Sequence, residues 1–343
     1  MKKSLVALAA LAATAAFAQS SVTLSGIADA YVGQTKNFAG TSQTVVNSGG
    51  LSESRVGLSV KEDLGSGMQG FVVLEGGFNL DAGTRRAVRK SVLGLTGSFG
   101  TVGLGAQQSP LSQVVENVID AQSDSVFSSV RGVQGGSTFR TISNSVRYDT
   151  PNFDGFNAAV QVGLGENKVA GAAPAAVRAT RDTAFSVGYA NGPLAVALAH
   201  EIAESQVAAL PNNLVDKVTA TVLGGAYDFG VVKLNLGFGN TKQSRLSGND
   251  KALSIGLTAP VGAFTVVGQL SRAKATNQFA AANFTGANNV NGTSNRTSAG
   301  LEGRYALSKR TTSYVGFNQT KDGNQASATD TSRVFGVGVR HVF

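Results

Sequence analysis

Residues able to carry out acid–base or nucleophilic chemistry are scarce in this chain. It has no Cys and only two His among 343 residues, which excludes thiol nucleophiles and leaves few candidates for a general base. His200 precedes Glu201 where a strand is expected to end, and His341 lies close to the end of an apolar segment. A structural role is the commoner explanation at both places, so we expect no enzyme activity, no bound cofactor and no metal site.

One glycine motif matches a nucleotide-binding pattern by letter. Residues 65–70 read Gly-Ser-Gly-Met-Gln-Gly, but dinucleotide binding needs a helix directly after these glycines. Residues 71–75, Phe-Val-Val-Leu-Glu, predict a strand instead. A hairpin turn is therefore the better interpretation. The chain also lacks a Gly-x-Ser-x-Gly nucleophile elbow.

Charged side chains are sparse and evenly scattered. They make up 15% of the chain, against about 25% in an ordinary globular domain. Lys and Arg occur singly within apolar alternation, without the basic helix or the aromatic–basic cluster typical of nucleic-acid binding. We expect no nucleic-acid partner. Sparse charge suits a protein in which one set of side chains faces lipid and another faces water.

The first eighteen residues predict a signal peptide that is cleaved off. Lys2 and Lys3 precede a small-apolar run over residues 5–16, and Ala16-Phe17-Ala18 forms an A-x-A cleavage site. Removing the two lysines lowers the formal net charge from +8 to +6. The mature fold is expected over residues 19–343. Beyond the leader no run approaches the ~20 apolar residues of a membrane-spanning helix, which leaves a soluble secreted protein or a barrel.

Most of the mature chain alternates between apolar and polar residues with a period of two. In residues 156–164 and 231–240, one face is apolar and the other is small or polar, as in β-strands. Short turns are predicted near residues 66, 99, 153, 192, 229, 261 and 308. Longer connections are predicted at 37–52, 79–86, 109–139, 167–181, 204–215, 242–250, 276–296 and 321–331.

Short connections on one side and long ones on the other are typical of a membrane barrel. These breaks delimit about sixteen strands in an all-β, antiparallel transmembrane barrel. A soluble sandwich or propeller would alternate in the same way. The length of the strands, about ten residues, and a polar face rich in Gly, Ser and Asn rather than in charge favour the barrel.

Three segments carry a resemblance to a known family. Ser21–Gly26 reads Ser-Val-Thr-Leu-Ser-Gly, residues 144–155 read Asn-Ser-Val-Arg-Tyr-Asp-Thr-Pro-Asn-Phe-Asp-Gly, and the chain ends Gly-Val-Gly-Val-Arg-His-Val-Phe at Phe343. Over essentially its whole mature length the chain resembles the trimeric porins of Gram-negative bacteria, most closely those of β-proteobacteria. The resemblance implies an outer-membrane homotrimer through which small hydrophilic solutes and ions diffuse. It also implies that the barrel-assembly machinery recognises Phe343.

The resemblance further implies a third loop, Ser109 to about Gly136, that folds inward and narrows the pore. In the family, arginines on the wall face carboxylates on this loop. The matching wall positions are Arg55, Arg89 and Arg147, and the loop carboxylates are Glu116, Asp120 and Asp124. Arg86 and Arg140 are further candidates. The alternative is that these are solvated charges without a special role.

Strand parity orients the wall arginines. Val56 and Leu58, Val92 and Gly94, and Val146 and Tyr148 alternate with the three arginines, so the arginines are expected to point inward, where charge costs little. The inward basic residues by this count are Arg55, Arg89, Arg147, Lys233, Arg304 and Arg340, and the inward acids are Asp29, Asp149 and Glu302. This excess predicts a preference for anions. A substrate-specific channel and a structural or adhesive barrel remain as alternatives.

Overall fold

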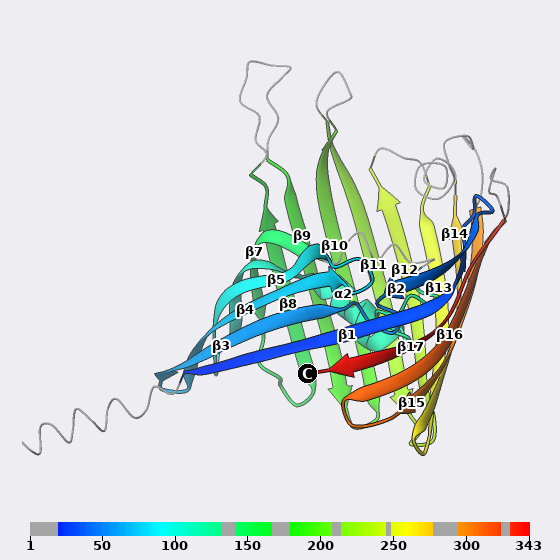
Figure 1. The fold of residues 1–343 in the computed structure, drawn as a ribbon. Helices are drawn as coiled ribbons and strands as arrows, with labels where there is room; N and C mark the ends of the chain where they lie inside the picture. The colour runs from blue at the N-terminus through cyan, green and yellow to red at the C-terminus, as the bar shows by residue number, and fades with distance from the viewer. Residues whose placement is uncertain are drawn as a thin grey trace, which may run out of the picture.

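The described part of the chain forms a closed antiparallel β-barrel (Figure 1). In the computed structural model, residues 20–131, 141–166, 179–207, 214–244, 248–276, 294–323 and 330–343 are described. From β3 onward each strand segment pairs with the next one, and β1 pairs with β17 to close the ring. The segments are β1 (Ser21–Lys36), β2 (Ser42–Ser48), β3 (Arg55–Gly65), β4 (Met68–Asn79), β5 (Thr84–Gly97), β6 (Gly100–Gln108), β7 (Thr141–Asp149), β8 (Phe156–Leu164), β9 (Arg181–Asn191), β10 (Leu194–Val207), β11 (Leu214–Asp228), β12 (Lys233–Gln243), β13 (Asp250–Val261), β14 (Phe264–Ala275), β15 (Ser294–Ala306), β16 (Thr311–Asp322) and β17 (Thr331–Val342).

The barrel has sixteen strand positions, because β2 and β3 share one of them. Both segments pair with β1: β2 pairs with residues 30–36 and β3 with residues 21–27. Residues 49–54 interrupt this position. The predicted strand number is confirmed, whereas the predicted loop at 37–52 is wrong for residues 42–48, which form β2.

The apolar faces of the strands point outward. Val22, Leu93 and Leu253 are 67%, 59% and 62% exposed, whereas the polar Gln161 and Glu302 are fully buried inside the ring. A soluble sandwich would bury its apolar face in a shared core. This barrel presents that face to its surroundings, as a wall in contact with lipid must. The predicted alternation is confirmed, and its orientation is that of a membrane barrel.

The connection after β6 folds into the barrel (Figure 1). It contains α2 (Pro110–Val114) and the π-helical turn η1 (Val115–Ile119). Ser109 caps α2 by accepting a hydrogen bond from the Ser112 N–H at 3.1 Å. In the part of the chain that the structure describes, no helix is long and apolar enough to span a membrane.

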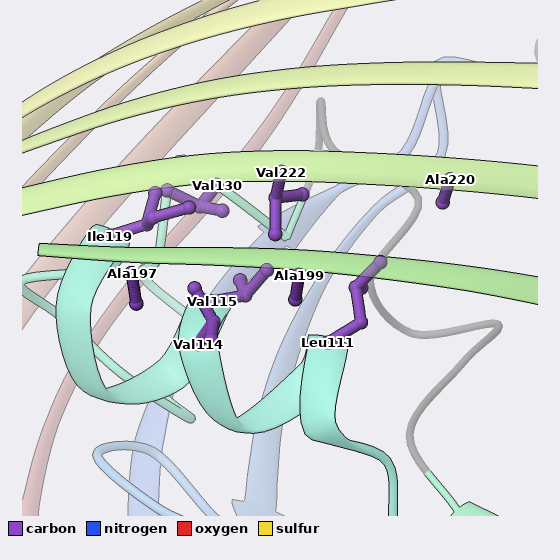
Figure 2. Close-up of a cluster of buried hydrophobic side chains, with 9 residues drawn as sticks. All are labelled: Leu111, Val114, Val115, Ile119, Val130, Ala197, Ala199, Ala220 and Val222. Atoms are coloured by element: carbon purple, nitrogen blue, oxygen red, sulfur yellow. The ribbon is translucent and has the colours of Figure 1, made fainter. Parts of the chain in front are cut away.

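The apolar core lies between this inner loop and the wall. Figure 2 shows the loop side chains, with Leu111, Val115 and Ile119 among them, beside the strands β10 and β11. The wall residues there include Ala197 and Ala199 on β10, whose small side chains leave room for the helical turns. The buried contacts therefore hold the loop against one side of the barrel.

A row of five glycines, here called the glycine track, extends the surface of the wall that the inner loop contacts. The five glycines, one each on β11, β12, β13, β15 and β16, are Gly224, Gly237, Gly256, Gly300 and Gly316. A Cβ at Gly237 would lie 2.1 Å from Ile119 Cγ2, and one at Gly316 would lie 2.2 Å from the Phe127 ring. A side chain at these positions would force Ile119 or Phe127 to move, so the glycine track lets the inner loop lie close to the wall.

Candidate pore constriction

Inside the barrel, the wall and the inner loop line a polar cavity of about 430 Å³. Its charged lining residues are Arg55, Arg89, Arg304 and Arg340 from the wall and Glu116 and Asp124 from the loop. A larger cavity of about 620 Å³ lies toward the long connections, where Lys36 on β1 pairs with Arg333 on β17. Asp124 lines both cavities. The loop tip therefore borders both cavities, as a constriction inside a pore would.

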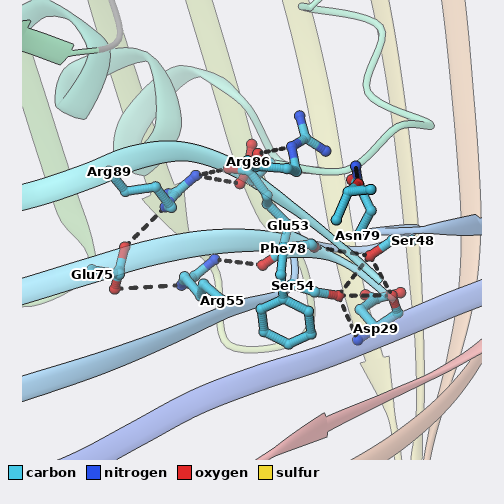
Figure 3. A network of polar contacts seen from close by, with 12 residues as sticks. Asp29, Ser48, Glu53, Ser54, Arg55, Glu75, Phe78, Asn79, Arg86 and Arg89 are labelled. Carbon is cyan, nitrogen blue, oxygen red and sulfur yellow. Dashed lines mark hydrogen bonds and ion pairs between the residues drawn. The ribbon is translucent and has the colours of Figure 1, made fainter. Parts of the chain in front are cut away.

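Arg89 and Asp124 are the predicted wall and loop residues that the structure brings into direct contact. The Nη1 atom of Arg89 lies 3.6 Å from Asp124 Oδ2. Arg89 also donates a hydrogen bond through Nε to Glu75 at 2.9 Å and forms an ion pair with Glu53 (Figure 3). Arg55 lies beside it, with its Nε atom 3.6 Å from Glu75 Oε2.

Glu53 and Glu75 are site residues that the sequence analysis missed. Glu75 lies on β4 and pairs across the sheet with Gly57 and Lys90 on the adjacent strands, so its inward parity could have been found from the sequence. Glu53 precedes β3 within the interruption at 49–54. Its position depends on that break, which strand periodicity does not reveal.

The parity argument for Arg89 was wrong, although its side chain does point inward. Val92 is 6% exposed and Leu93 is 59% exposed, so Val92 lies on the inner face rather than the outer one. The register shifts between Glu75, which pairs with Lys90, and the next pair of β4 and β5. Arg89 is the extra residue of this β-bulge, which redirects its side chain. The expected parity is borne out for Arg55 by the exposed Val56 and Leu58, and for Arg147 by the exposed Val146 and Tyr148.

Arg147 is inward-facing but buried at the base of the loop. It is 6% exposed and donates to Asp149 through Nε at 2.9 Å, to the Gln108 carbonyl at 2.7 Å and to Gln113 Oε1 at 2.7 Å. These bonds fix the first turn of the inner loop. The structure thus separates Arg147 from the cavity lined by Arg55 and Arg89.

Asp120 is buried within the loop itself. Its carboxylate accepts hydrogen bonds from the Gln122 N–H at 2.9 Å and from Ser128 Oγ at 2.6 Å. Burial raises the pKa of Asp120 to about 7. Among the predicted loop acids, Glu116 and Asp124 line the cavity, whereas Asp120 closes the loop tip.

The remaining predicted charges divide between the cavities and the wall. Arg86 pairs with Glu53 at 2.7 Å and lines the larger cavity, and Arg140 lies outside the described residues. Asp29 and Glu302, expected to be inward acids, are fully buried. Both carboxylates point into the ring, as expected, but each is engaged by hydrogen bonds inside the wall and neither is exposed to the lumen.

Polar side chains of the wall hold the loop backbone in place. Asn235 donates to the Val118 carbonyl at 2.8 Å, Gln269 donates to the Ile119 carbonyl at 3.1 Å, and Asn318 donates to the Phe127 carbonyl at 3.1 Å. Gln122 donates to Glu302 Oε1 at 3.2 Å. Because buried polar groups are costly to leave unpaired, these contacts favour one pose of the loop.

A sixteen-position barrel with an apolar outer face, and with an inner loop that borders two cavities in its lumen, defines an outer-membrane channel. The family model for Gram-negative porins matches residues 4–325. Outer membrane porin protein 32 of Delftia acidovorans is 37% identical over 276 residues, which are 76% of this chain and 77% of that protein. An outer membrane porin protein of Bordetella pertussis is 33% identical over the full length of both chains.

A solved structure supports the same assignment. An anion-selective porin from Comamonas acidovorans superposes with a TM-score of 0.77 and 29% sequence identity, covering 95% of this chain and 100% of that chain. The chain belongs to the Gram-negative porin family. It is an outer-membrane β-barrel channel for the passive diffusion of small hydrophilic solutes.

Proposed function

We propose that this channel prefers anions and that the cavity lined by Arg55, Arg89, Arg304 and Arg340 is its selective constriction. The observation that carries the proposal is the excess of positive charge there, since four arginines and two carboxylates, Glu116 and Asp124, line the cavity. The side chains of Arg55 and Arg304 are 23% and 27% exposed, whereas that of Asp124 is 8% exposed. The Glu302 carboxylate, which pairs with Arg304, is fully buried. A passing solute therefore meets guanidinium groups more than carboxylates.

Two further observations support this reading. Low-dielectric walls focus the field of such charges into the lumen, and Arg304 and Arg340 line the cavity directly. The similar porin of Comamonas acidovorans is described as anion-selective. Arg55, Arg89, Glu116 and Asp124 keep the constriction role expected of them. Arg147 and Asp120 act instead by holding the loop.

The test is the reversal potential of the purified protein in a planar bilayer under a KCl gradient. We expect a chloride preference in dilute salt that fades toward 1 M, because the screening length falls from about 10 Å at 0.1 M to about 3 Å at 1 M. Cation preference in dilute KCl would overturn the proposal. A folded, inserted sample without conductance would favour a structural or adhesive barrel.

We also propose a homotrimer whose barrels insert through the assembly machinery by way of Phe343. The terminal residue exchanges two backbone hydrogen bonds with Gly26 on β1, at 2.9 and 3.0 Å, and its ring lies on the outer face, 42% exposed. Cross-linking in detergent that yields trimers tests the oligomer. The signal peptide over residues 1–18 lies outside the described residues and stays a prediction, as does the absence of enzyme activity.

A further inference from the structure

Residues 49–54, which separate β2 from β3, form an inward ledge. On β1 the pairing with β2 ends at Ala30 and the pairing with β3 begins at Ile27. The six residues 49–54 thus lie opposite Ala28 and Asp29 of β1, which pair with β17 but with neither β2 nor β3. Leu51 and Ser52 line the cavity of the constriction, so the extra chain projects into the lumen.

The Asp29 carboxylate on β1 holds the ledge through hydrogen bonds to its backbone. Its Oδ1 atom accepts from the Gly50 N–H at 2.8 Å, and its Oδ2 atom accepts from the Leu51 and Ser52 N–H groups at 2.9 and 3.0 Å. The Tyr314 hydroxyl donates a fourth bond, to Oδ1, at 2.5 Å. Three successive N–H groups directed at one anion form a nest, and an ionised carboxylate can accept all four bonds.

A serine closes the gap in the strand ladder. Ser54 Oγ accepts from the Asp29 N–H at 3.0 Å and donates to the Asp29 carbonyl at 2.9 Å, as Figure 3 shows. The hydroxyl therefore takes the place of a strand partner for the Asp29 N–H, and the Asp29 carbonyl also accepts from the Gly49 N–H at 2.7 Å. The ledge can bulge inward without leaving these buried groups unpaired.

The ledge contacts both the loop tip and the arginines. The Gly50 carbonyl accepts from the Val126 N–H at 2.9 Å and from Ser125 Oγ at 3.0 Å. Ser52 Oγ accepts from Arg340 Nε at 2.8 Å. Glu53 forms ion pairs with Arg86 and Arg89 (Figure 3). Arg55 Nη1 also donates to the Glu53 carbonyl, at 3.1 Å. One short segment thus touches four arginines that line the two cavities.

We propose that the ledge is a specificity element of the pore: Asp29 positions it, and Glu53 moderates the anion preference by compensating Arg86 and Arg89. Glu53 is the charged group that the solute senses, and Asp29 acts only through the placement of Glu53. The proposal rests on the proposed anion preference, but its measurements are shifts relative to the wild type. They keep their meaning whatever the absolute selectivity of the wild-type pore.

The first experiment compares Glu53→Gln with Glu62→Gln in a planar bilayer. Glu62 is an exposed carboxylate at the turn end of β3, so its loss changes the net charge equally. We expect Glu53→Gln to raise the chloride-to-potassium permeability ratio about two- to threefold in 0.1 M salt, as removal of one charge beside the permeation path requires. Glu62→Gln should leave the ratio unchanged. Equal ratios for Glu53→Gln and the wild type would overturn the role of Glu53.

The second experiment introduces Asp29→Asn and Tyr314→Phe separately, each into the wild-type protein and into the Glu53→Gln variant. Asn presents an N–H donor to the ledge, and Tyr314→Phe removes a single bond to Asp29 while keeping the ring. In the wild-type background each should shift the ratio in the direction of Glu53→Gln, by a smaller amount. In the Glu53→Gln background neither should shift it further. A shift that persists there would overturn the positioning role of Asp29.

The two proposals fail separately. A wild-type pore that prefers cations refutes the proposed anion preference, whereas the Glu53→Gln shift would still establish the ledge as a selectivity element. An anion-preferring wild type with no shift in any ledge variant refutes the ledge and leaves the proposed function standing. Tyr314→Phe supplies the positioning test if Asp29→Asn does not fold.

Discussion

Asp120 and Ser128 close the tip of the inner loop, with Asp120 Oδ2 accepting a hydrogen bond from Ser128 Oγ at 2.6 Å. The carboxyl group is shielded from water, and this burial raises its pKa to about 7. In a locally opened loop the same group would titrate near its ordinary value of 3.8. The closed loop therefore binds more protons than the open loop between these two pH values.

Loop stability should consequently fall as pH rises from about 4 to about 7 and stay constant above it. For one such group, the open-to-closed ratio rises by up to about tenfold per pH unit within that window. Hydrogen exchange of the loop amides, corrected for the intrinsic rate, measures this ratio. Asp120→Asn should flatten the profile. An unchanged profile in that variant would show that another group controls the loop.

Neutralising Arg55 and Arg304 together should weaken or invert the anion preference. Both side chains line the constriction and are partly exposed, so their loss should lower the chloride-to-potassium ratio by about fivefold in dilute salt. Reversal potentials measure the ratio. The control replaces Lys309 and Arg310, which lie exposed at the turn between β15 and β16. A similar change in the control would mean that net charge alone sets selectivity.

Arg147→Gln should disturb the loop more than it disturbs selectivity through lost charge. The guanidinium holds the Gln108 carbonyl and Gln113 at the loop base, and hydrogen bonds from a charged group each contribute about 1.5–3 kcal/mol. We expect a broader distribution of single-channel conductances and faster exchange in residues 110–119. Uniform channels with a lower anion preference would instead place Arg147 among the lumen charges.

The glycine track offers a matched pair of substitutions on β11. A Cβ at Gly224 would lie 2.5 Å from Ile119 Cγ1, whereas a Cβ at Gly225 would have no atom within 4 Å. Gly224→Ala should displace the loop at a cost of about 1–3 kcal/mol and change the conductance. Gly225→Ala should leave conductance and loop exchange at their wild-type values. If both variants show the same conductance and the same loop exchange, the wall rather than the loop moves to make room for the Cβ at position 224.

Deleting Phe343 should impair assembly and leave the pore unaltered. The residue completes the pairing of the closing strand with Gly26 and covers it with its ring, and an unclosed barrel exposes a strand edge. We expect a lower level in the outer membrane, with normal conductance of any channel that forms. Leu307→Ala, which also removes an exposed apolar side chain, should assemble normally. Wild-type levels after the deletion would refute the assembly role.

The strands and their turns were predictable because lipid outside and water inside impose a strict alternation along each strand. The outward Val56 and Val146, and hence the direction of Arg55 and Arg147, follow from that rule alone. Where the rule is locally broken, prediction failed. The bulge at Arg89 shifts the register by one residue, and the ledge adds six residues to a wall position.

The roles of the charges were less predictable than their directions. Inward parity places Arg55 and Arg147 on the same face, yet one lines the cavity and the other is buried against Gln108 and Gln113. What separates them is contact with the loop, which lies far from either strand position in the sequence. Glu53 was missed for the same reason, since its neighbours are set by the ledge.

The glycine track also constrains the order in which the protein folds. The inner loop follows β6 in the chain, but the glycines that it contacts lie on strands between β11 and β16. These contacts join segments that are distant in sequence, and contacts of that kind form slowly. The loop therefore cannot dock against the wall until β11 to β16 have formed, and its docking belongs to the late steps of barrel assembly.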